Sequence, residues 1–531
     1  MKSDVEVVIP PGGELNGLLS DFRWEQSNDA PLLLSFSFVA PGSDFDQEEY
    51  EVEPPNPTTD SEFRAYTDAE KALVRGVIAE LETLANIRFT EVTDSQATDI
   101  RFGISNAGDS AAYAYTPDSM YYLDTLAPDE DIESYGLSGD VWLDTSSTLA
   151  EAGEAFFVST VIHELGHALG LSHPHDSFYY IDRDEPVTDA LILKNGEYDQ
   201  YRYTVMSYNP VANNELDILT SGDRENTTYS KLDIEALQFL YGASTDEVSD
   251  AYLIGELSAQ SAAVIAFSPE RIHQHDNLYV GIGDGGGDNA LIIDVGAQSL
   301  EISLLPGSWS NTGGGATTAT QPVPSDNLWL ADSARIALLV TGAGDDLVYD
   351  SEASHTVNLG SGADTFVYLA GDDVLDGDQG ADLLRLPQPV SRYQFSSDEE
   401  GQVYLKELTA GARITSISFE QLAFSDGRIL SSDDILLQLQ DGNLDLLAQP
   451  ALPPYQSDIH SDDGGLDSAQ QAQLYRTYFG AMNRAPDEGG YDWWLERLQV
   501  GEFVFDEVAD RFLDSPEFRG LADGNEDSII S

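Results

Sequence analysis

Three histidines at fixed offsets are the residues of this sequence best suited to metal chemistry. His163 and His167 are four residues apart, so on a helix both imidazoles leave the same face, one turn apart. Gly170 allows the chain to leave that helix through a positive φ angle, and the turn that follows would bring His173 round as a third ligand. Three neutral ring nitrogens can hold one Zn²⁺ and leave a position open, which is the arrangement of a catalytic zinc site. Glu164 could then act as general base towards a water at that position, whose pKa the metal lowers.

The helix that carries these histidines also needs a buried face. Ile162, Leu165 and Leu169 lie opposite the histidines at helical spacing, which predicts packing against a sheet. The competing interpretation is a helix whose histidines face solvent or are satisfied in the core. His175, two residues beyond the motif, is interpreted as a loop histidine.

An α/β segment surrounds the motif, from residue 29 to about 245. Residues 32–38, 87–92, 99–104 and 140–144 have the apolar runs or alternation of strands. Thr67 and Asp68 are suited to cap a helix that continues to about residue 84. The apolar residues of that helix fall on one face: Leu73, Val74, Val77, Ile78, Leu81 and Leu84.

A methionine and a tyrosine follow the histidine motif in Tyr203-Thr204-Val205-Met206-Ser207-Tyr208. Together these residues resemble the metzincin clan of zinc metallopeptidases, and more closely the serralysins, which are secreted bacterial zinc endopeptidases with a calcium-binding β-roll. The resemblance covers about residues 30–388. It implies one catalytic zinc on His163, His167 and His173, with Met206 as an apolar base beneath it. It also implies that Tyr208 is a conditional zinc ligand that stabilises the transition state.

The same resemblance implies how a substrate would bind. Protein or peptide substrates are expected to lie in extended, antiparallel form along an edge strand, for which Gly139-Asp140-Val141-Trp142 is the candidate. Residues 232–242 resemble the helix that closes the catalytic domain. The acidic, Pro-rich insertion 41–62 and the long segment 177–200 could reshape the cleft, so subsite preferences do not transfer.

Five nonapeptide units rich in Gly and Asp occupy residues 341–385. Every unit has an apolar residue in its eighth place, and four units have Asp in the sixth place, where the second unit has His355. The glycines permit tight turns whose carbonyls face inward, and the aspartates supply hard oxygens suited to Ca²⁺. The predicted calcium residues are Gly342, Gly344, Asp346, Gly360, Gly362, Asp364, Gly371, Asp373, Gly380 and Asp382.

These units resemble the repeats of toxin-type (RTX) β-rolls, in which two units form one coil and same-side turns recur every 18 residues. Asp346, Asp364 and Asp382 would then lie on one side, and His355 and Asp373 on the other. We expect several structural Ca²⁺ ions, with good sites on the first side and weakened sites on the second. The alternative is a flexible Gly/Asp-rich linker. A second Gly/Asp cluster at 283–288 is out of register and is equally consistent with a loop or an ion site.

The charge of the chain narrows its partners. Lys plus Arg number 24 against 95 for Asp plus Glu, a net charge of −71, which disfavours nucleic acid and anionic membrane surfaces. The absence of cysteine excludes disulfides and thiolate metal sites. We find no apolar run long enough to span a bilayer and no conventional N-terminal signal peptide. The resemblance to serralysins then implies a secreted, extracellular bacterial protein that uses the type I secretion machinery, and a monomer is expected.

The predicted fold is multidomain: an α/β (α+β) metzincin catalytic domain, a parallel β-roll and a small all-α C-terminal domain. The expected boundaries are 1–28 for an N-terminal segment that could be a propeptide, 29–245 for the catalytic domain, 246–440 for the calcium-binding region, 441–465 for a linker and 466–531 for a helical domain. The aromatic residues of this last domain could form a binding surface or the core of a small bundle. The leading interpretation is a secreted, calcium-stabilised zinc endopeptidase. The alternative is a non-enzymatic, calcium-dependent surface or adhesion protein with a vestigial protease domain.

Overall fold

The computed structural model describes residues 4–7, 15, 17–27, 30–43, 63–108, 110–117, 137–174, 198–209, 226–245, 248–255, 267, 269–275, 279–283, 287–312, 326–398, 402–441 and 497. The chain forms two compact units. The first comprises Met1–Val295 and Pro306–Leu338, and the second comprises Gly296–Leu305 and Leu339–Ser531. The domain boundaries expected from the sequence remain predictions.

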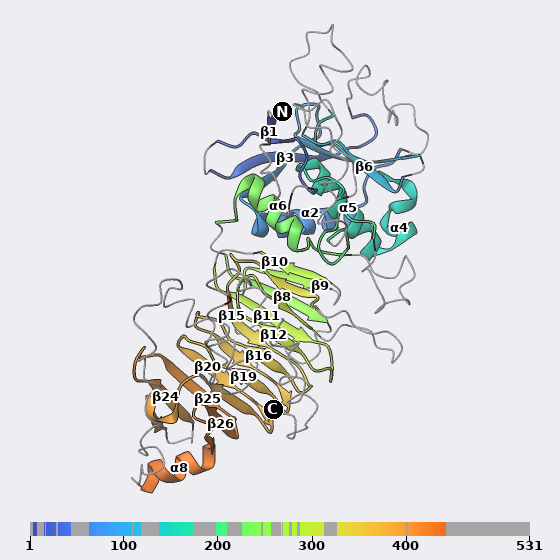
Figure 1. Ribbon diagram of the computed structural model, residues 1–531. Coiled ribbons are helices and arrows are strands. Elements are labelled where there is room, and N and C mark those ends of the chain that lie inside the picture. The colour runs from blue at the N-terminus through green and yellow to red at the C-terminus, as the bar shows by residue number, and fades with distance from the viewer. Residues whose placement is uncertain are drawn as a thin grey trace. The chain divides into compact units, whose positions relative to one another are not determined.

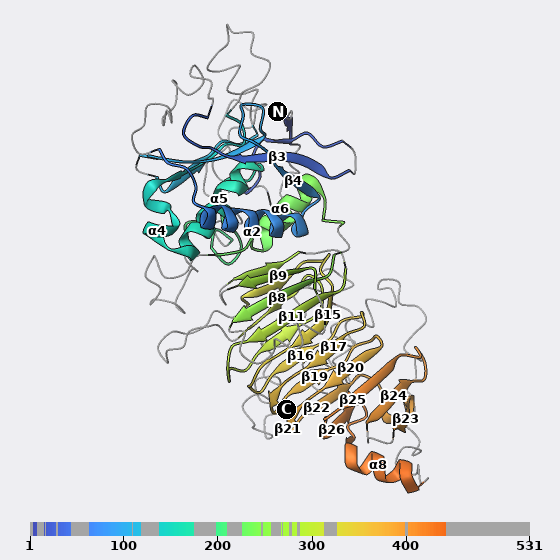
Figure 2. The same cartoon turned by 180° about the vertical axis from the view of Figure 1, so that it is seen from behind.

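A five-stranded sheet organises the first unit, in the order β4-β3-β5-β7-β6. The strands are β3 (Leu32–Phe38), β4 (Ile87–Glu91), β5 (Ile100–Ser105), β6 (Ala112–Ala114) and β7 (Val141–Asp144). All pairs are parallel except β6 with β7. Helices α2 (Asp68–Leu84), α5 (Glu154–Ala168) and α6 (Lys231–Tyr241) lie on one face of this sheet (Figures 1 and 2). The strands predicted at 32–38, 87–92, 99–104 and 140–144 are confirmed to within a residue or so at each end.

The edge of this sheet differs from the prediction. Residues 139–142 were expected to form the edge strand, but β7 lies between β5 and β6, with Val141 and Trp142 fully buried. The edge strand is β6, three residues long and antiparallel to β7. A strand of three residues carries too little alternation to be recognised in the sequence, which explains the error.

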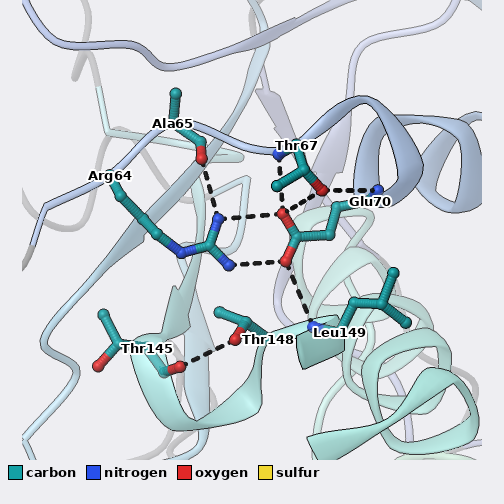
Figure 3. A network of polar contacts seen from close by, with 7 residues as sticks. All are labelled: Arg64, Ala65, Thr67, Glu70, Thr145, Thr148 and Leu149. Atoms are coloured by element: carbon teal, nitrogen blue, oxygen red, sulfur yellow. Dashed lines mark hydrogen bonds and ion pairs between the residues drawn. The ribbon is translucent and has the colours of Figure 1, made fainter. Parts of the chain in front are cut away.

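Helix α2 begins where the sequence predicts, because Thr67 caps it. The Thr67 side chain accepts a hydrogen bond from the Glu70 backbone, and the Glu70 carboxylate accepts one from the Thr67 backbone. Glu70 is 1% exposed and also accepts two hydrogen bonds from the Arg64 guanidinium, at 2.6 and 3.0 Å (Figure 3). The Leu149 backbone donates to the same carboxylate at 3.3 Å. One carboxylate therefore joins the start of α2 to the segment that leads into α5.

The first unit contains further short elements before and after the sheet. They are β1 (Asp4–Glu6), β2 (Phe22–Trp24), η1 (Thr145–Ser147), α4 (Leu149–Ala152), β8 (Asp250–Gly255), β9 (Arg271–His275), β10 (Val280–Ile282), β11 (Asn289–Asp294), β13 (Trp309–Ser310) and β14 (Leu328–Leu330). The chain passes from the first unit to the second within β15 (Ile336–Val340).

The second unit is built from parallel strands that repeat every 18 residues. Val348 pairs with Phe366, which is the Cα partner position of Leu384 on the next strand, and Val357 pairs with Leu375 on the other side of the coil. These eighth-place residues are all buried, as the repeat pattern predicts, and the strands lie side by side in Figures 1 and 2.

The elements of the second unit are β12 (Glu301–Ser303), β16 (Leu347–Tyr349), β17 (Thr356–Asn358), β18 (Ser361–Gly362), β19 (Thr365–Val367), β20 (Asp373–Asp376), β21 (Gln379–Gly380), β22 (Leu383–Leu386), η3 (Val390–Arg392), β23 (Tyr393–Ser397), β24 (Val403–Glu407), β25 (Arg413–Ile417), β26 (Gln421–Phe424), β27 (Ile429–Ser431) and α8 (Ser432–Asp441).

Two sequence expectations meet the limits of the described chain. The linker 441–465 and the all-α domain 466–531 lie outside the described residues, apart from Asp441 and Arg497. Within the described part of the chain, none of the helices combines the length and the apolar character needed to cross a bilayer.

Replacing Glu70 by Gln tests the importance of its network for the fold. Burial alone would raise the pKa of Glu70, but the hydrogen bonds from Arg64 and Thr67 outweigh burial and hold the pKa at about 2. Relative to the ordinary value of 4.5, this shift corresponds to roughly 3 kcal/mol of folding free energy. Because the pKa is lowered on folding, this contribution is present above pH 4.5 and is lost as the pH falls from 4.5 towards 2.

The measurement is urea unfolding of the wild type and Glu70→Gln, followed by tryptophan fluorescence at pH 7 and pH 3. We expect the variant to be less stable at pH 7 and the difference to shrink at pH 3. Glu91→Gln is the matched control, because Glu91 pairs with Arg75 on the surface, where such pairs contribute about 0–1 kcal/mol. Equal stability of Glu70→Gln and wild type at pH 7 would contradict the assignment.

Candidate active site

Helix α5 presents two of the three predicted zinc ligands. Its apolar residues Ile162 and Leu165 are buried against the unit, as predicted, and this orientation directs His163 and His167 to the opposite face. The helix ends at Ala168, and Gly170 has φ of +96°, the left-handed conformation expected at this position. The turn brings His173 back towards the two helical histidines.

The three imidazoles converge through their Nε2 atoms. His173 Nε2 lies 3.1 Å from His163 Nε2 and 3.1 Å from His167 Nε2. Two nitrogens bound tetrahedrally at about 2.0–2.1 Å to one Zn²⁺ would be separated by about 3.3 Å. The three nitrogens form a possible metal-binding group, the one found among the described His, Asp and Glu residues. The donor set and its spacing fit zinc.

Backbone carbonyls fix the orientation of the two helical histidines. His163 Nδ1 lies 2.8 Å from the Val205 carbonyl oxygen, and His167 Nδ1 lies 2.9 Å from the Leu171 carbonyl oxygen. A carbonyl can only accept, so in both rings Nδ1 carries the proton and Nε2 keeps its lone pair for a metal. Sequence spacing gave no indication of these two acceptors.

Glu164 is buried beside the first ligand and is 6% exposed. Its Oε2 atom has no hydrogen-bond partner among the described residues. Burial raises the pKa of this carboxyl to about 8. A dication bound by the adjacent histidines would favour the charged form and bring the pKa down. A buried carboxylate with a free acceptor oxygen has the properties required of a general base.

Met206 and Tyr208 flank the three histidines. Met206 is fully buried, and a Cβ atom added at Gly166 would lie 2.8 Å from its sulfur, so the thioether packs against α5 between the two ligands. The Tyr208 hydroxyl lies 2.7 Å from His173 Nε2, and the ring stacks on His163 at 5.5 Å between centroids. The Tyr208 side chain is 57% exposed, which places its hydroxyl between the ligand cluster and solvent.

Asp233, at the start of α6, anchors the turn that contains Met206. Its carboxylate accepts hydrogen bonds from Thr204 Oγ1 at 2.6 Å, from the Val205 backbone at 2.9 Å and from the Ser230 backbone at 2.9 Å. Val205 in turn supplies the carbonyl that orients His163. Asp233 was not recognised from the sequence, although Ser230 and Asp233 have the spacing of a capping box.

Comparison with known proteins agrees with this geometry. Residues 56–181 match the matrixin family of peptidases. The chain is 28% identical to serralysin of Photorhabdus laumondii, over 64% of this chain and 63% of that protein. It is 27% identical to serralysin of Proteus mirabilis, over 55% of this chain and 56% of that protein. Metallopeptidase AprA of Pseudomonas marginalis is 26% identical, over 56% of each chain.

This part of the chain is a serralysin-type metzincin domain. The matched region spans less than two thirds of the length of these relatives. The family implies a catalytic zinc, and the residues that would hold it in this metzincin domain are the three histidines predicted from the sequence. His175 and most of the segments 41–62 and 177–200 lie outside the described residues.

The sixth-place aspartates of the second unit form a column. Asp364 Oδ1 accepts from the Asp346 backbone at 2.8 Å, and Asp382 Oδ1 accepts from the Asp364 backbone at 2.9 Å. The Oδ2 atoms of Asp346, Asp364, Asp373 and Asp382 are buried and have no hydrogen-bond partner among the described residues. Burial raises the pKa of Asp346 and Asp382 to about 6 and that of Asp364 to about 7. Buried carboxylate oxygens without donors are a donor set that fits a hard cation such as Ca²⁺.

Glycines allow adjacent turns of this unit to approach closely. A Cβ atom at Gly362 would lie 1.9 Å from the Gly344 carbonyl oxygen, and one at Gly380 would lie 1.5 Å from the Gly362 carbonyl oxygen. Gly360 and Gly371 are equally close to the preceding coil and have positive φ. Side chains are therefore excluded from these four predicted positions.

The other side of the repeat differs, because His355 replaces a carboxylate. His355 is buried, and its Nε2 atom lies 2.7 Å from Ser351 Oγ and 3.5 Å from Asp350 Oδ1. Its backbone donates to Asp373 Oδ1 at 2.7 Å. An imidazole therefore occupies the place that a carboxylate oxygen holds on the first side. Of the Gly/Asp cluster at 283–288, Gly283, Gly287 and Asp288 are described, and they carry no metal-binding group.

Proposed function

We propose that this protein is a secreted, calcium-stabilised zinc endopeptidase. The observation that carries the proposal is the convergence of three imidazole Nε2 atoms beside the buried, unpartnered oxygen of Glu164. A vestigial site has no constraint that would keep all of these groups in place. This argument favours the peptidase over an adhesion protein with an inactive protease domain.

Three groups would divide the chemistry of peptide hydrolysis. A zinc ion on His163, His167 and His173 would supply an electrophile that polarises the scissile carbonyl and lowers the pKa of water. Glu164 would accept a proton from the attacking water and deliver it to the leaving amine. The Tyr208 hydroxyl would donate a hydrogen bond to the negative charge that develops on the carbonyl oxygen.

Replacing Glu164 by Gln tests the proposed general base. The amide keeps the shape of the side chain but cannot take the proton, so we expect casein hydrolysis in millimolar Ca²⁺ to fall roughly 10²–10⁴-fold. Zinc content, measured by mass spectrometry, should stay at one ion per chain. Glu154→Gln, exposed at the start of the same helix, is the control and should keep wild-type activity. Wild-type hydrolysis by Glu164→Gln would exclude the assigned role.

Strand β6 is the proposed place for an extended substrate. Ala111, at its start, accepts from the Asp144 backbone, and the Tyr115 backbone donates to Asp140. Hydrogen-bonding residues alternate along an antiparallel pair, so the main-chain groups of Ala112 and Ala114 point away from β7. These groups could pair with a peptide by β-augmentation.

Replacing Ala114 by Pro tests this edge. Proline removes an N–H that faces away from the sheet, so the fold should tolerate it. Loss of one substrate hydrogen bond should lower kcat/KM about tenfold. Ala114→Ser keeps the N–H and is the matched control. If both variants cleave peptides as the wild type does, the substrate does not pair with this residue.

Calcium is the proposed stabiliser of the second unit. Cations against the buried Oδ2 atoms would remove the cost of placing these carboxylates in the interior of a strongly acidic chain. Low calcium inside the cell would leave the repeats unfolded and high calcium outside would fold them, which suits export without an N-terminal signal through a type I system. Asp346, Asp364 and Asp382 would give the stronger sites.

Calcium counting on variants tests the two sides of the repeat. We expect Asp364→Asn to bind less Ca²⁺ than the wild type in equilibrium dialysis and to unfold at a lower temperature. His355→Asp should bind more Ca²⁺, because it restores a carboxylate on the second side. Asp345→Asn, at an exposed neighbouring position, should match the wild type. Unchanged calcium binding by Asp364→Asn would contradict the proposed sites.

A further inference from the structure

The N-terminal part of the first unit pairs directly with the loop between two zinc ligands. Leu19 and Leu171 form an antiparallel bridge. On either side of it, the Ser20 backbone donates to the Gly170 carbonyl at 2.8 Å and the Ser172 backbone donates to the Leu18 carbonyl at 2.9 Å. Residues 170–172 lie between His167 and His173, so this pairing holds the connection between the second and third ligands.

The same segment satisfies the carbonyls at the end of α5. The Trp24 indole donates to the Ala168 carbonyl at 2.8 Å. The Tyr241 hydroxyl donates to the Leu169 carbonyl at 2.7 Å and accepts from the Trp24 backbone at 3.2 Å. The last carbonyls of a helix have no partner within it, so these donors define where α5 ends.

The segment is part of the core of this unit and not a peripheral extension. Leu18 is 0% exposed, and Leu19 and Trp24 are each 1% exposed. A Cβ atom at Gly170 would lie 2.7 Å from the Phe22 carbonyl oxygen, so the glycine that turns the chain towards His173 also admits the N-terminal segment.

Leu171 connects this packing to the metal-binding group. Its carbonyl oxygen is the acceptor that orients His167 through Nδ1. The bridge to Leu19 and the two flanking hydrogen bonds fix the peptide on both sides of this carbonyl. The position of the His167 ring therefore depends on a segment almost 150 residues earlier in the chain.

We infer that residues 17–24 position the zinc ligands His167 and His173. The inference rests on the zinc part of the proposed function. It implies that any processing that removes the N-terminal segment must stop before Gly17, because removal of all of residues 1–28 would take away the partners of the ligand loop.

The test replaces single donors of this segment and measures zinc affinity by competition with a chelator. Ser20→Pro removes the backbone donor to Gly170, while Ser20→Ala retains it and is the matched control. Trp24→Phe removes the indole donor and is the second variant, should Ser20→Pro fail to fold. Val74→Ala creates a cavity in α2, at a buried residue outside this network, and controls for loss of stability alone.

We expect Ser20→Pro and Trp24→Phe to weaken zinc binding about tenfold or more, as loss of groups that orient metal ligands does. Their Co²⁺-substituted forms should show a shifted visible spectrum, because the ligand geometry changes. Ser20→Ala and Val74→Ala should keep wild-type affinity and spectrum. Wild-type zinc affinity in both Ser20→Pro and Trp24→Phe would overturn the inference.

The wild type separates this inference from the proposed function. If it binds one zinc but hydrolyses no peptide, the peptidase proposal fails while the affinity comparison still tests the positioning role. If it binds no zinc, both fail.

Discussion

The orientation of two imidazole rings by backbone carbonyls is the constraint on which the catalytic geometry depends. His163 and His167 can direct their Nε2 atoms to one point only if each Nδ1–H has a fixed acceptor, and Val205 and Leu171 supply these acceptors. Each acceptor is held in turn by a distant element. Asp233 of α6 holds Val205, and the N-terminal segment around Leu19 holds Leu171. Segments from both ends of the first unit thereby set the position of a ligand group carried by one helix and one turn.

A different constraint governs the second unit. Its parallel coils place one carboxylate above another every 18 residues, and burial makes their ionisation unfavourable. Glycines at the turns allow the coils to approach so closely that only a small ligand, a cation or a proton, could offset the charge. The acidic composition of the chain as a whole adds to this repulsion. The folded state of this unit is therefore expected to depend on its cations, as that of the first unit does not.

The spacing of residues in the sequence was sufficient to predict the zinc ligands, the strands of the central sheet, α2 and the 18-residue repeat, because each leaves a periodic signal. The edge strand was predicted wrongly, since β6 is too short to carry such a signal and β7 has the stronger pattern. The acceptors Val205 and Leu171 could not be predicted, because any residue has a carbonyl and only the fold decides which one faces a ring. Asp233 could have been noticed through its capping box, but its contact with the turn of Met206 is tertiary. The role of residues 17–24 was hidden for the same reason.

The central claim is that three imidazole nitrogens of this chain hold one zinc ion and leave a position open. X-ray absorption at the zinc edge, on wild-type protein loaded with one equivalent of zinc in the presence of Ca²⁺, tests it most directly. The account predicts three imidazole nitrogens at about 2.0–2.1 Å and one or two further oxygen ligands. A spectrum with fewer than three imidazoles, or with a carboxylate in place of one of them, would contradict it.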